Sequence, residues 1–140
     1  MKVLLSIKPE FADKIFSGEK TYEFRKSIFR DKNVKTVVVY ATRPVAQIIG
    51  EFDVISVVSD SPDRLWNMTE EGAGISREFF EEYFAGRSCA FALKIGNATL
   101  YETPVEPSDL IENFTAPQSY MYVEDDYSRR REAPESLALF

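Results

Sequence analysis

Histidine is absent from this 140-residue chain, and cysteine occurs only once. Without imidazole there is no Ser-His or Cys-His nucleophile pair, no usual general base near neutral pH and no imidazole ligand for zinc. The single cysteine, Cys89, has no partner for an internal disulfide, and its apolar surroundings favour a buried, inert thiol. Any catalysis must therefore use Lys, Glu, Asp, Tyr, Ser or Thr, and we expect neither a metal nor another cofactor.

Long apolar runs are also missing. None approaches the roughly 20 residues that a membrane-spanning helix needs, so we expect no membrane association. The apolar stretch between Lys2 and Lys8 is shorter than the roughly 7–15 residues of a secretory signal. We read it as a first strand and expect a cytoplasmic location by default.

The net charge of −6 argues against a dedicated duplex-DNA binder, whose affinity comes from neutralising phosphates. The charge is unevenly distributed, because residues 1–43 hold ten Lys and Arg against five Asp and Glu, whereas residues 44–140 hold seven against eighteen. A locally positive site on an acidic protein suits a compact anionic or polar ligand. Length and composition predict one domain over residues 1–123, followed by a charged, flexible tail over 124–140.

Periodicity and turn residues predict an α+β fold in which short strands are interrupted by two or three short helices. The predicted strands are 2–7, 20–26, 36–41, 47–58, 88–95, 99–105 and 118–123. Helices are predicted over 9–18, from 61 and over 76–84, with a turn or short helix over 107–113. Gly50 predicts a bulge, and Gly96-Asn97 predicts the tight turn of a closing hairpin. Together these elements predict a small mixed β-barrel with peripheral helices.

The segment from Gly18 to Lys26 is the most informative. Its alternation places Glu23 and Arg25 on one face of a strand, while Lys20 has the opposite parity and joins them only if the strand begins irregularly. If they converge, Arg25 holds Glu23 ionised or grips an anion, and Lys20, with a lowered pKa, acts as base or nucleophile. The alternative is a solvated strand face whose ion pairs contribute little, and spacing alone favours it.

Weaker candidates lie at the ends of other predicted strands. They are Ser6, Lys8, Thr42, Arg43, Gln118 and Ser119. The first four could rim the same pocket or serve as ordinary turn residues. The last two precede Tyr120 and could hydrogen-bond and stack a base, or belong to an edge strand. Helical spacing indicates that Trp66 and the aromatic residues at 79, 80, 83 and 84 are core rather than a ligand platform.

Several segments resemble the ASCH domain family of the PUA-like superfamily. The resemblance covers about residues 3–123, and its most specific part is the G-x-K-x-x-E-x-R pattern from Gly18 to Arg25. It is also carried by 5–12, 15–26, 39–45, 49–52, 74–80 and 116–120. The subgroup it is most similar to is described as predicted transcriptional regulators, although no helix-turn-helix is evident here.

This resemblance implies a β-barrel with a cleft lined by the motif residues and a role in binding RNA or a nucleotide. Some relatives hydrolyse the acetyl amide of N4-acetylcytidine with a lysine, a threonine and a glutamate. Their lysine corresponds to Lys20, but their threonine falls at Glu23, Thr21 has the wrong parity to replace it, and their glutamate has no clear match. A ribonuclease activity of other members implies Lys20 and Arg25 as phosphorane stabilisers and Glu23 as base.

Three functions follow from this reading. The leading hypothesis is a module that binds RNA, another single-stranded nucleic acid, or a nucleotide or modified nucleoside, with a regulatory role. The second is a small metal-independent hydrolase, either a nucleoside amidohydrolase or a ribonuclease, with Lys20 and Glu23 as catalytic residues. The third is an interaction module whose cleft is plugged by side chains. The ligand and the oligomeric state are not predicted by the sequence.

Overall fold

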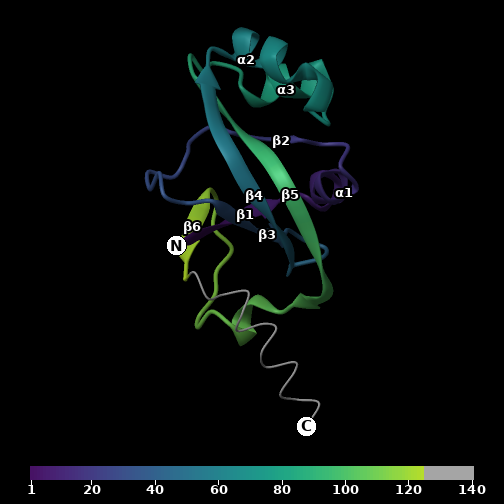
Figure 1. Ribbon diagram of the computed structural model, residues 1–140, viewed down its shortest axis with the longest axis vertical. Helices are drawn as coiled ribbons and strands as arrows, with labels where there is room; N and C mark the ends of the chain where they lie inside the picture. The colour runs from purple at the N-terminus through teal and green to yellow at the C-terminus, as the bar shows by residue number, and fades with distance from the viewer. Residues whose placement is uncertain (125–140) are drawn as a thin grey trace.

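The computed structural model describes residues 1–124, and six strands and three helices account for most of them (Figure 1). The elements are β1 (Lys2–Ile7), α1 (Pro9–Ser17), β2 (Tyr22–Arg25), β3 (Thr36–Ala41), β4 (Gln47–Asp60), α2 (Pro62–Thr69), α3 (Arg77–Tyr83), β5 (Ala90–Val105) and β6 (Tyr120–Val123). Short 3₁₀ turns lie at Glu70–Gly72 and Pro107–Asp109. The predicted tail lies outside the described residues, apart from Glu124.

The six strands form one mixed sheet in the order β2-β5-β4-β3-β1-β6. Strands β1 and β3 are parallel and pair Leu5 with Val39, while every other neighbouring pair is antiparallel. The two parallel strands, β1 and β3, are apolar runs with little exposure, as strands covered on both faces require. Strands β4 and β5 form a long curved ribbon that runs through much of the molecule (Figure 1). The predicted α+β class is confirmed.

The predicted closed barrel is wrong, because the sheet remains open between its two edges. Strand β2 pairs only with β5, and β6 pairs only with β1. The Arg25 guanidinium crosses the seam instead: Nη1 donates to the Ser6 carbonyl at 3.3 Å and Nη2 donates to the Ser119 carbonyl at 2.7 Å. A side chain thus replaces the backbone hydrogen bonds that would close a barrel, and this leaves room for a cavity in the seam.

The predicted hairpin at Gly96-Asn97 is also wrong. Strand β5 runs unbroken through this dipeptide and stays paired with β4, with Ile95 opposite Val54 and Ala98 opposite Phe52. Two residues of β5 therefore face one residue of β4, which is a β-bulge. A long partner strand was available to continue the pairing, so the local turn preference of Gly-Asn did not decide the structure.

The bulge predicted at Gly50 is present. Strand β4 changes register there against both neighbours, and Gly50 lies opposite Val39 and Leu100. A Cβ atom at this position would lie 2.5 Å from the Thr99 carbonyl oxygen and 2.7 Å from Cζ of Phe16. Glycine is required here because two neighbouring groups approach the backbone closely.

Apolar clusters on both sides of the sheet hold the helices in place. Helix α1 buries Ala12 and Ile15 against one cluster, and α2 and α3 pack Leu65, Trp66 and Phe80 against another at the far end of the β4–β5 ribbon (Figure 1).

Cys89 is exposed, so its predicted burial is wrong. It precedes β5, and the buried run begins at the next residue. Within residues 1–124, no helix has the length and apolarity to cross a membrane.

Candidate functional site

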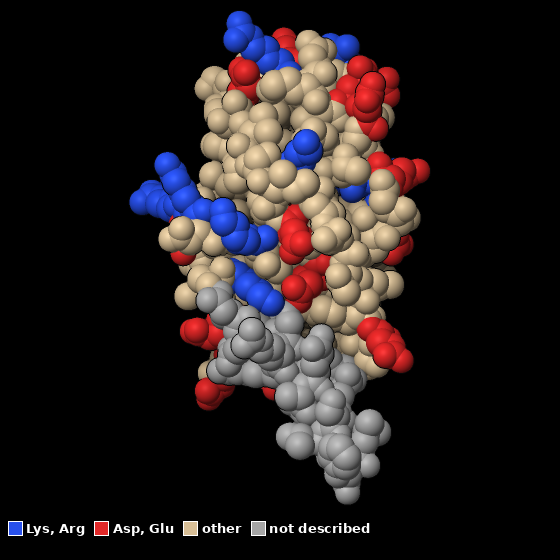
Figure 2. Space-filling view, in the orientation of Figure 1, with Lys and Arg blue, Asp and Glu red and all other residues tan. Residues whose placement is uncertain are grey.

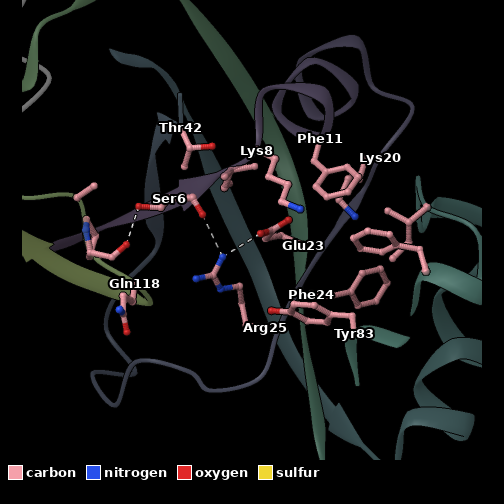
Figure 3. Close-up of a pocket in the computed structure, with 15 residues that line it drawn as sticks. Ser6, Lys8, Phe11, Lys20, Glu23, Phe24, Arg25, Thr42, Tyr83 and Gln118 are labelled. Carbon is pink, nitrogen blue, oxygen red and sulfur yellow. Dashed lines mark hydrogen bonds and ion pairs between the residues drawn. The ribbon is translucent and has the colours of Figure 1, made fainter. Parts of the chain in front are cut away.

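A cavity of about 440 Å³ lies in the open seam of the sheet (Figure 3). Its wall is built from the end of β1, helix α1, the Lys20–Arg25 segment, the residues around α3 and the loop before β6. The lining residues are Ser6, Ile7, Lys8, Phe11, Lys20, Glu23, Phe24, Arg25, Thr42, Ile75, Phe79, Tyr83, Ala116, Pro117 and Gln118. The cavity is open rather than plugged, unlike the cleft expected of a pure interaction module.

Lys20 reaches this cavity because the chain is irregular before β2. Gly18 adopts φ 85° and ends α1 in the left-handed region that favours glycine. The backbone N–H of Lys20 then donates to the Lys14 carbonyl, and that of Thr21 donates to the Gly72 carbonyl, both at 2.9 Å. Regular pairing starts only with the next residue. Strand parity therefore does not apply to Lys20, and its side chain turns to the same side as those of the motif's other charged residues.

The Lys20 ammonium group is buried without a paired carboxylate. The residue is 2% exposed, and Nζ donates a 2.6 Å hydrogen bond to the Ala73 carbonyl. Nζ also lies 4.7 Å from the ring centroid of Phe24 and 5.8 Å from that of Phe11. Burial lowers the pKa of Lys20 from 10.5 to about 8, although Glu23 nearby partly opposes this shift. An ammonium donates up to three hydrogen bonds, so donors remain for a ligand.

Glu23 and Arg25 form an ion pair beside this lysine. Arg25 Nη1 donates to Oε2 of Glu23 at 3.3 Å, and both side chains are largely buried. The same guanidinium is fixed by the carbonyls of Ser6 and Ser119. In Figure 3 the Lys8 and Lys20 amino groups and the Glu23 carboxylate point into a common space. The arginine is thus held in place, while the amino groups and the carboxylate face the cavity.

Aromatic side chains form the other wall. Phe11 and Phe79 meet edge to face with centroids 5.3 Å apart, and Tyr83 lies on the same side of α3 as Phe79. Ser76 caps α3 by accepting a 3.1 Å hydrogen bond from the Phe79 N–H. Burial raises the pKa of the Tyr83 phenol, which keeps the hydroxyl protonated as a hydrogen-bond donor.

The core assignment of the aromatic residues of α3 was therefore only half right. Phe80 and Phe84 are buried in the core, whereas Phe79 and Tyr83 line the cavity. The signal was present in the sequence, since positions 79 and 83 form one i,i+4 stripe and positions 80 and 84 form another. Two adjacent aromatic stripes on a short helix indicate that the helix packs against the core with one stripe and faces a different environment with the other.

The weaker candidates divide between the cavity and its outer edge. Ser6, Lys8, Thr42 and Gln118 all line it. Ser6 Oγ donates to the Pro117 carbonyl at 2.8 Å, which joins β1 to the loop before β6. The exposed Lys8 lies with Nζ 5.8 Å from the ring centroid of Phe79.

Arg43 and Ser119 do not line the cavity. Arg43 is exposed in a turn in which the N–H of Val45 donates to the Thr42 carbonyl. Ser119 directs its hydroxyl to Ser27 Oγ at 3.1 Å, and only its carbonyl contacts Arg25. Thr21 lines a separate groove, so it does not supply the hydroxyl that the amide-hydrolysing relatives use.

The cavity combines three cationic side chains, one carboxylate and an aromatic wall. Lys8, Lys20 and Arg25 outnumber Glu23, so the cavity is positive at neutral pH even though the chain as a whole is acidic. Nowhere in residues 1–124 do three Cys, Asp or Glu side chains gather as a metal site would need. This arrangement can hold a flat, partly apolar ligand that carries an anionic group.

The family model of the ASCH domain matches residues 5–99. The chain belongs to the ASCH domain family. A Zymomonas mobilis protein named as an ASCH domain-containing ribonuclease is 30% identical over 135 residues, which cover 92% of this chain and 88% of that protein. The cavity residues from Ser6 to Tyr83 fall within the matched region, whereas Ala116, Pro117 and Gln118 follow it.

Two solved structures share this fold. The crystal structure of ASCH from Zymomonas mobilis superposes with a TM-score of 0.86 at 28% identity and covers 94% of each chain. The N-terminal domain of Staphylothermus marinus McrB gives a TM-score of 0.58 at 16% identity and covers 96% of this chain and 93% of that one. At that identity, the McrB likeness concerns the fold alone.

Proposed function

We propose that the chain binds single-stranded RNA by taking one nucleotide into the cavity. The observation that carries this proposal is the juxtaposition of the buried Lys20 ammonium with an aromatic wall in one open pocket. A nucleotide has the matching parts, namely a flat base that stacks on aromatic rings and a phosphate that accepts charged hydrogen bonds. The cavity volume of about 440 Å³ suits one small ligand rather than a duplex.

Each wall has a defined part in this proposal. The base lies against Phe79 and Tyr83, and the Gln118 amide at the edge offers both a donor and an acceptor for base recognition. The phosphate lies near Lys20 and Lys8, whose amino groups have donors to spare. A protein with this chain's net charge repels polyanions in general, so a confined positive cavity favours a short unpaired segment. The ribonuclease name of the Zymomonas relative supports RNA as the ligand class.

Binding is tested by fluorescence anisotropy with a labelled ten-nucleotide single-stranded RNA of mixed sequence. Lys20→Met removes the buried charge while keeping the side-chain length, and we expect affinity to fall about ten- to hundredfold, the value of a charged hydrogen bond. The matched control is Lys94→Met, which removes an exposed lysine of β5 outside the cavity. Equal loss in both variants, or no loss in Lys20→Met, contradicts the proposal.

A second candidate function is metal-independent cleavage of the bound RNA. Two observations favour it: Lys20, with its pKa lowered to about 8, and Glu23 share one cavity, and the relative that covers nearly the whole chain is named a ribonuclease. A carboxylate as base and a lysine near its pKa as acid are the pair that proton transfer needs when histidine is absent.

The step is a transesterification within the RNA. Glu23 accepts the proton of the 2′-hydroxyl, the 2′-oxygen bonds to phosphorus, and the bond from phosphorus to the 5′-oxygen breaks. Lys20 donates a proton to the departing 5′-oxygen, so the products are a 2′,3′-cyclic phosphate and a 5′-hydroxyl. The cations around the phosphate stabilise the charge that develops on its oxygens.

Cleavage is tested with end-labelled RNA in the presence of EDTA. We expect turnover to persist with the chelator, to be lost in Glu23→Gln and to be absent on 2′-O-methyl RNA, which lacks the attacking hydroxyl. Cleavage of the 2′-O-methyl strand, or full activity of Glu23→Gln, contradicts this mechanism. Tight binding without turnover leaves the chain as a binding module.

Four further expectations from the sequence remain predictions. The domain is expected over residues 1–123, with the tail over 124–140 outside it. A cytoplasmic location and a role in transcriptional regulation also stay predictions, because no described residue supports either. The amidohydrolase alternative lacks its hydroxyl nucleophile at Glu23 and stays a prediction as well.

A further inference from the structure

The loop after β2 carries a concentration of positive charge that the cavity does not use. Residues 26–35, which we call the basic loop, contain Lys26, Arg30, Lys32 and Lys35 against the single acidic Asp31, and all four basic residues are exposed. Within the described part of the chain, the side-chain nitrogens of these four residues make no hydrogen bond or ion pair. In Figure 2 basic side chains gather on the flank where Figure 1 places this loop.

The basic loop begins at the cavity wall. Arg25, the last residue of β2, lines the cavity, and the next residue, Lys26, lies with Nζ 4.6 Å from the ring centroid of Tyr83. Ser27 Oγ then contacts Ser119 Oγ at 3.1 Å, beside the segment that supplies Gln118 to the cavity. The basic loop is therefore adjacent to the cavity. A nucleic-acid strand with one nucleotide in the cavity can continue directly along the loop.

Buried anchors hold the loop in a defined position. Phe29 and Val34 are 7% and 4% exposed, and the Phe29 ring packs edge to face on Tyr120 with centroids 6.1 Å apart. The Tyr122 hydroxyl accepts hydrogen bonds at 3.2 Å from the N–H groups of Arg30 and Asp31. Because the loop backbone is anchored in this way, the loop loses little conformational entropy when a ligand binds to its cations.

We infer that the basic loop binds the backbone of the RNA segment that flanks the nucleotide held in the cavity. This inference rests on the proposed function and extends it from one nucleotide to a strand. Four exposed cations within ten residues suit successive phosphates. The Tyr122 ring, whose hydroxyl contacts this loop and which is 39% exposed, suits an unpaired base. A single strand is the occupant that uses the cavity, the ring and the cations together.

The experiment compares two ligands and two matched double variants. Arg30→Gln/Lys32→Gln removes two charges from the basic loop, and Arg64→Gln/Lys94→Gln removes two exposed charges from α2 and β5 as the control. The ligands are a nucleoside monophosphate and a ten-nucleotide single-stranded RNA, with a duplex of the same sequence as a third probe. Dissociation constants are measured at 50 and 200 mM salt.

We expect the loop variant to bind the monophosphate like the parent and the ten-nucleotide strand more weakly. Two lost phosphate contacts flatten the slope of log K against log salt by about 1.4, so the parent's advantage shrinks about sevenfold between the two salt concentrations. An unchanged slope in the loop variant, an equal change in the control, or tighter binding of the duplex than of the single strand overturns the inference.

Failure of the proposed function gives a different pattern. In that case Lys20→Met binds both ligands like the parent, whatever the loop variant does. If Lys20→Met loses affinity for both ligands while the loop variant loses none for the strand, the cavity proposal stands and the loop inference falls. The two conclusions are therefore tested separately with the same set of proteins.

Discussion

Replacing Lys20 by methionine is expected to stabilise the fold at pH 7 while weakening ligand binding. The folded protein holds this ammonium at 2% exposure, and its pKa falls from 10.5 to about 8. A shift of this size corresponds to about 3 kcal/mol of unfavourable free energy for keeping the charge in the fold below pH 8. Methionine has a similar length, fills the site and carries no charge.

The net gain is smaller than the full penalty. The variant loses the hydrogen bond from Lys20 Nζ to the Ala73 carbonyl, worth about 1 kcal/mol, and leaves that carbonyl with one partner fewer. It also loses the contact of the ammonium with the Phe24 ring, worth about 1 kcal/mol. We therefore expect Lys20→Met to raise the free energy of unfolding at pH 7 by about 1–2 kcal/mol.

The pH dependence separates this explanation from a packing effect. Because the folded pKa lies below the unfolded one, the unfolded wild-type chain binds more protons between about pH 8 and 10.5. Wild-type stability attributable to Lys20 therefore rises with pH in that window, and Lys20→Met lacks this rise. From pH 7 to 9.5 the free energy of unfolding of the wild type should rise by about 2 kcal/mol relative to that of the variant. This rise cancels or reverses the variant's stability advantage at pH 7.

Urea unfolding at pH 7 and 9.5 measures this directly, with Lys94→Met as the exposed-lysine control. Other groups that titrate in the window are common to all three proteins, so they cancel in the comparison. The reasoning is refuted if Lys20→Met is less stable than the wild type at both pH values, or if their difference does not change with pH.

Three other perturbations test particular parts of the structure. Gly50→Ala should lower the free energy of unfolding by about 1–3 kcal/mol, because its Cβ would meet a backbone carbonyl of β5 at 2.5 Å; an unchanged urea midpoint would show that the bulge can relax. Ser76→Ala removes the N-cap of α3 and should lower stability by about 1 kcal/mol in thermal unfolding, whereas equal stability would mean that the cap contributes nothing. Affinity for a nucleoside monophosphate, measured by calorimetry, should fall between pH 7 and 9.5 as Lys20 loses its proton, and in Lys20→Met it should not; a parallel fall in both proteins would assign the pH dependence to another group.

Much of the framework follows from local sequence. Helix α1 is bounded by a proline at its start and a glycine at its end, and its boundaries match the prediction to within a residue. The apolar runs rich in β-branched residues form β1 and β3, as predicted, and Gly50 marks the bulge of β4. Strand alternation also correctly placed Glu23 and Arg25 on the same side. These features depend on residues a few positions apart, so periodicity and turn chemistry suffice to predict them.

Tertiary contacts decided the features that make the site. Gly96-Asn97 became a bulge because β4 was long enough to pair past it. The sheet stays open between β2 and β6, and Arg25 bonds there to carbonyls 19 and 94 residues away in the chain. The burial of Lys20 depends on Ala73, 53 residues away, and no local pattern distinguishes a buried lysine from a solvated one. By itself, the sequence determined that Glu23 and Arg25 lie on one side of a strand. Only the tertiary structure decided that Lys20 joins this pair and that the three residues line a cavity, because desolvation depends on which segments pack around them.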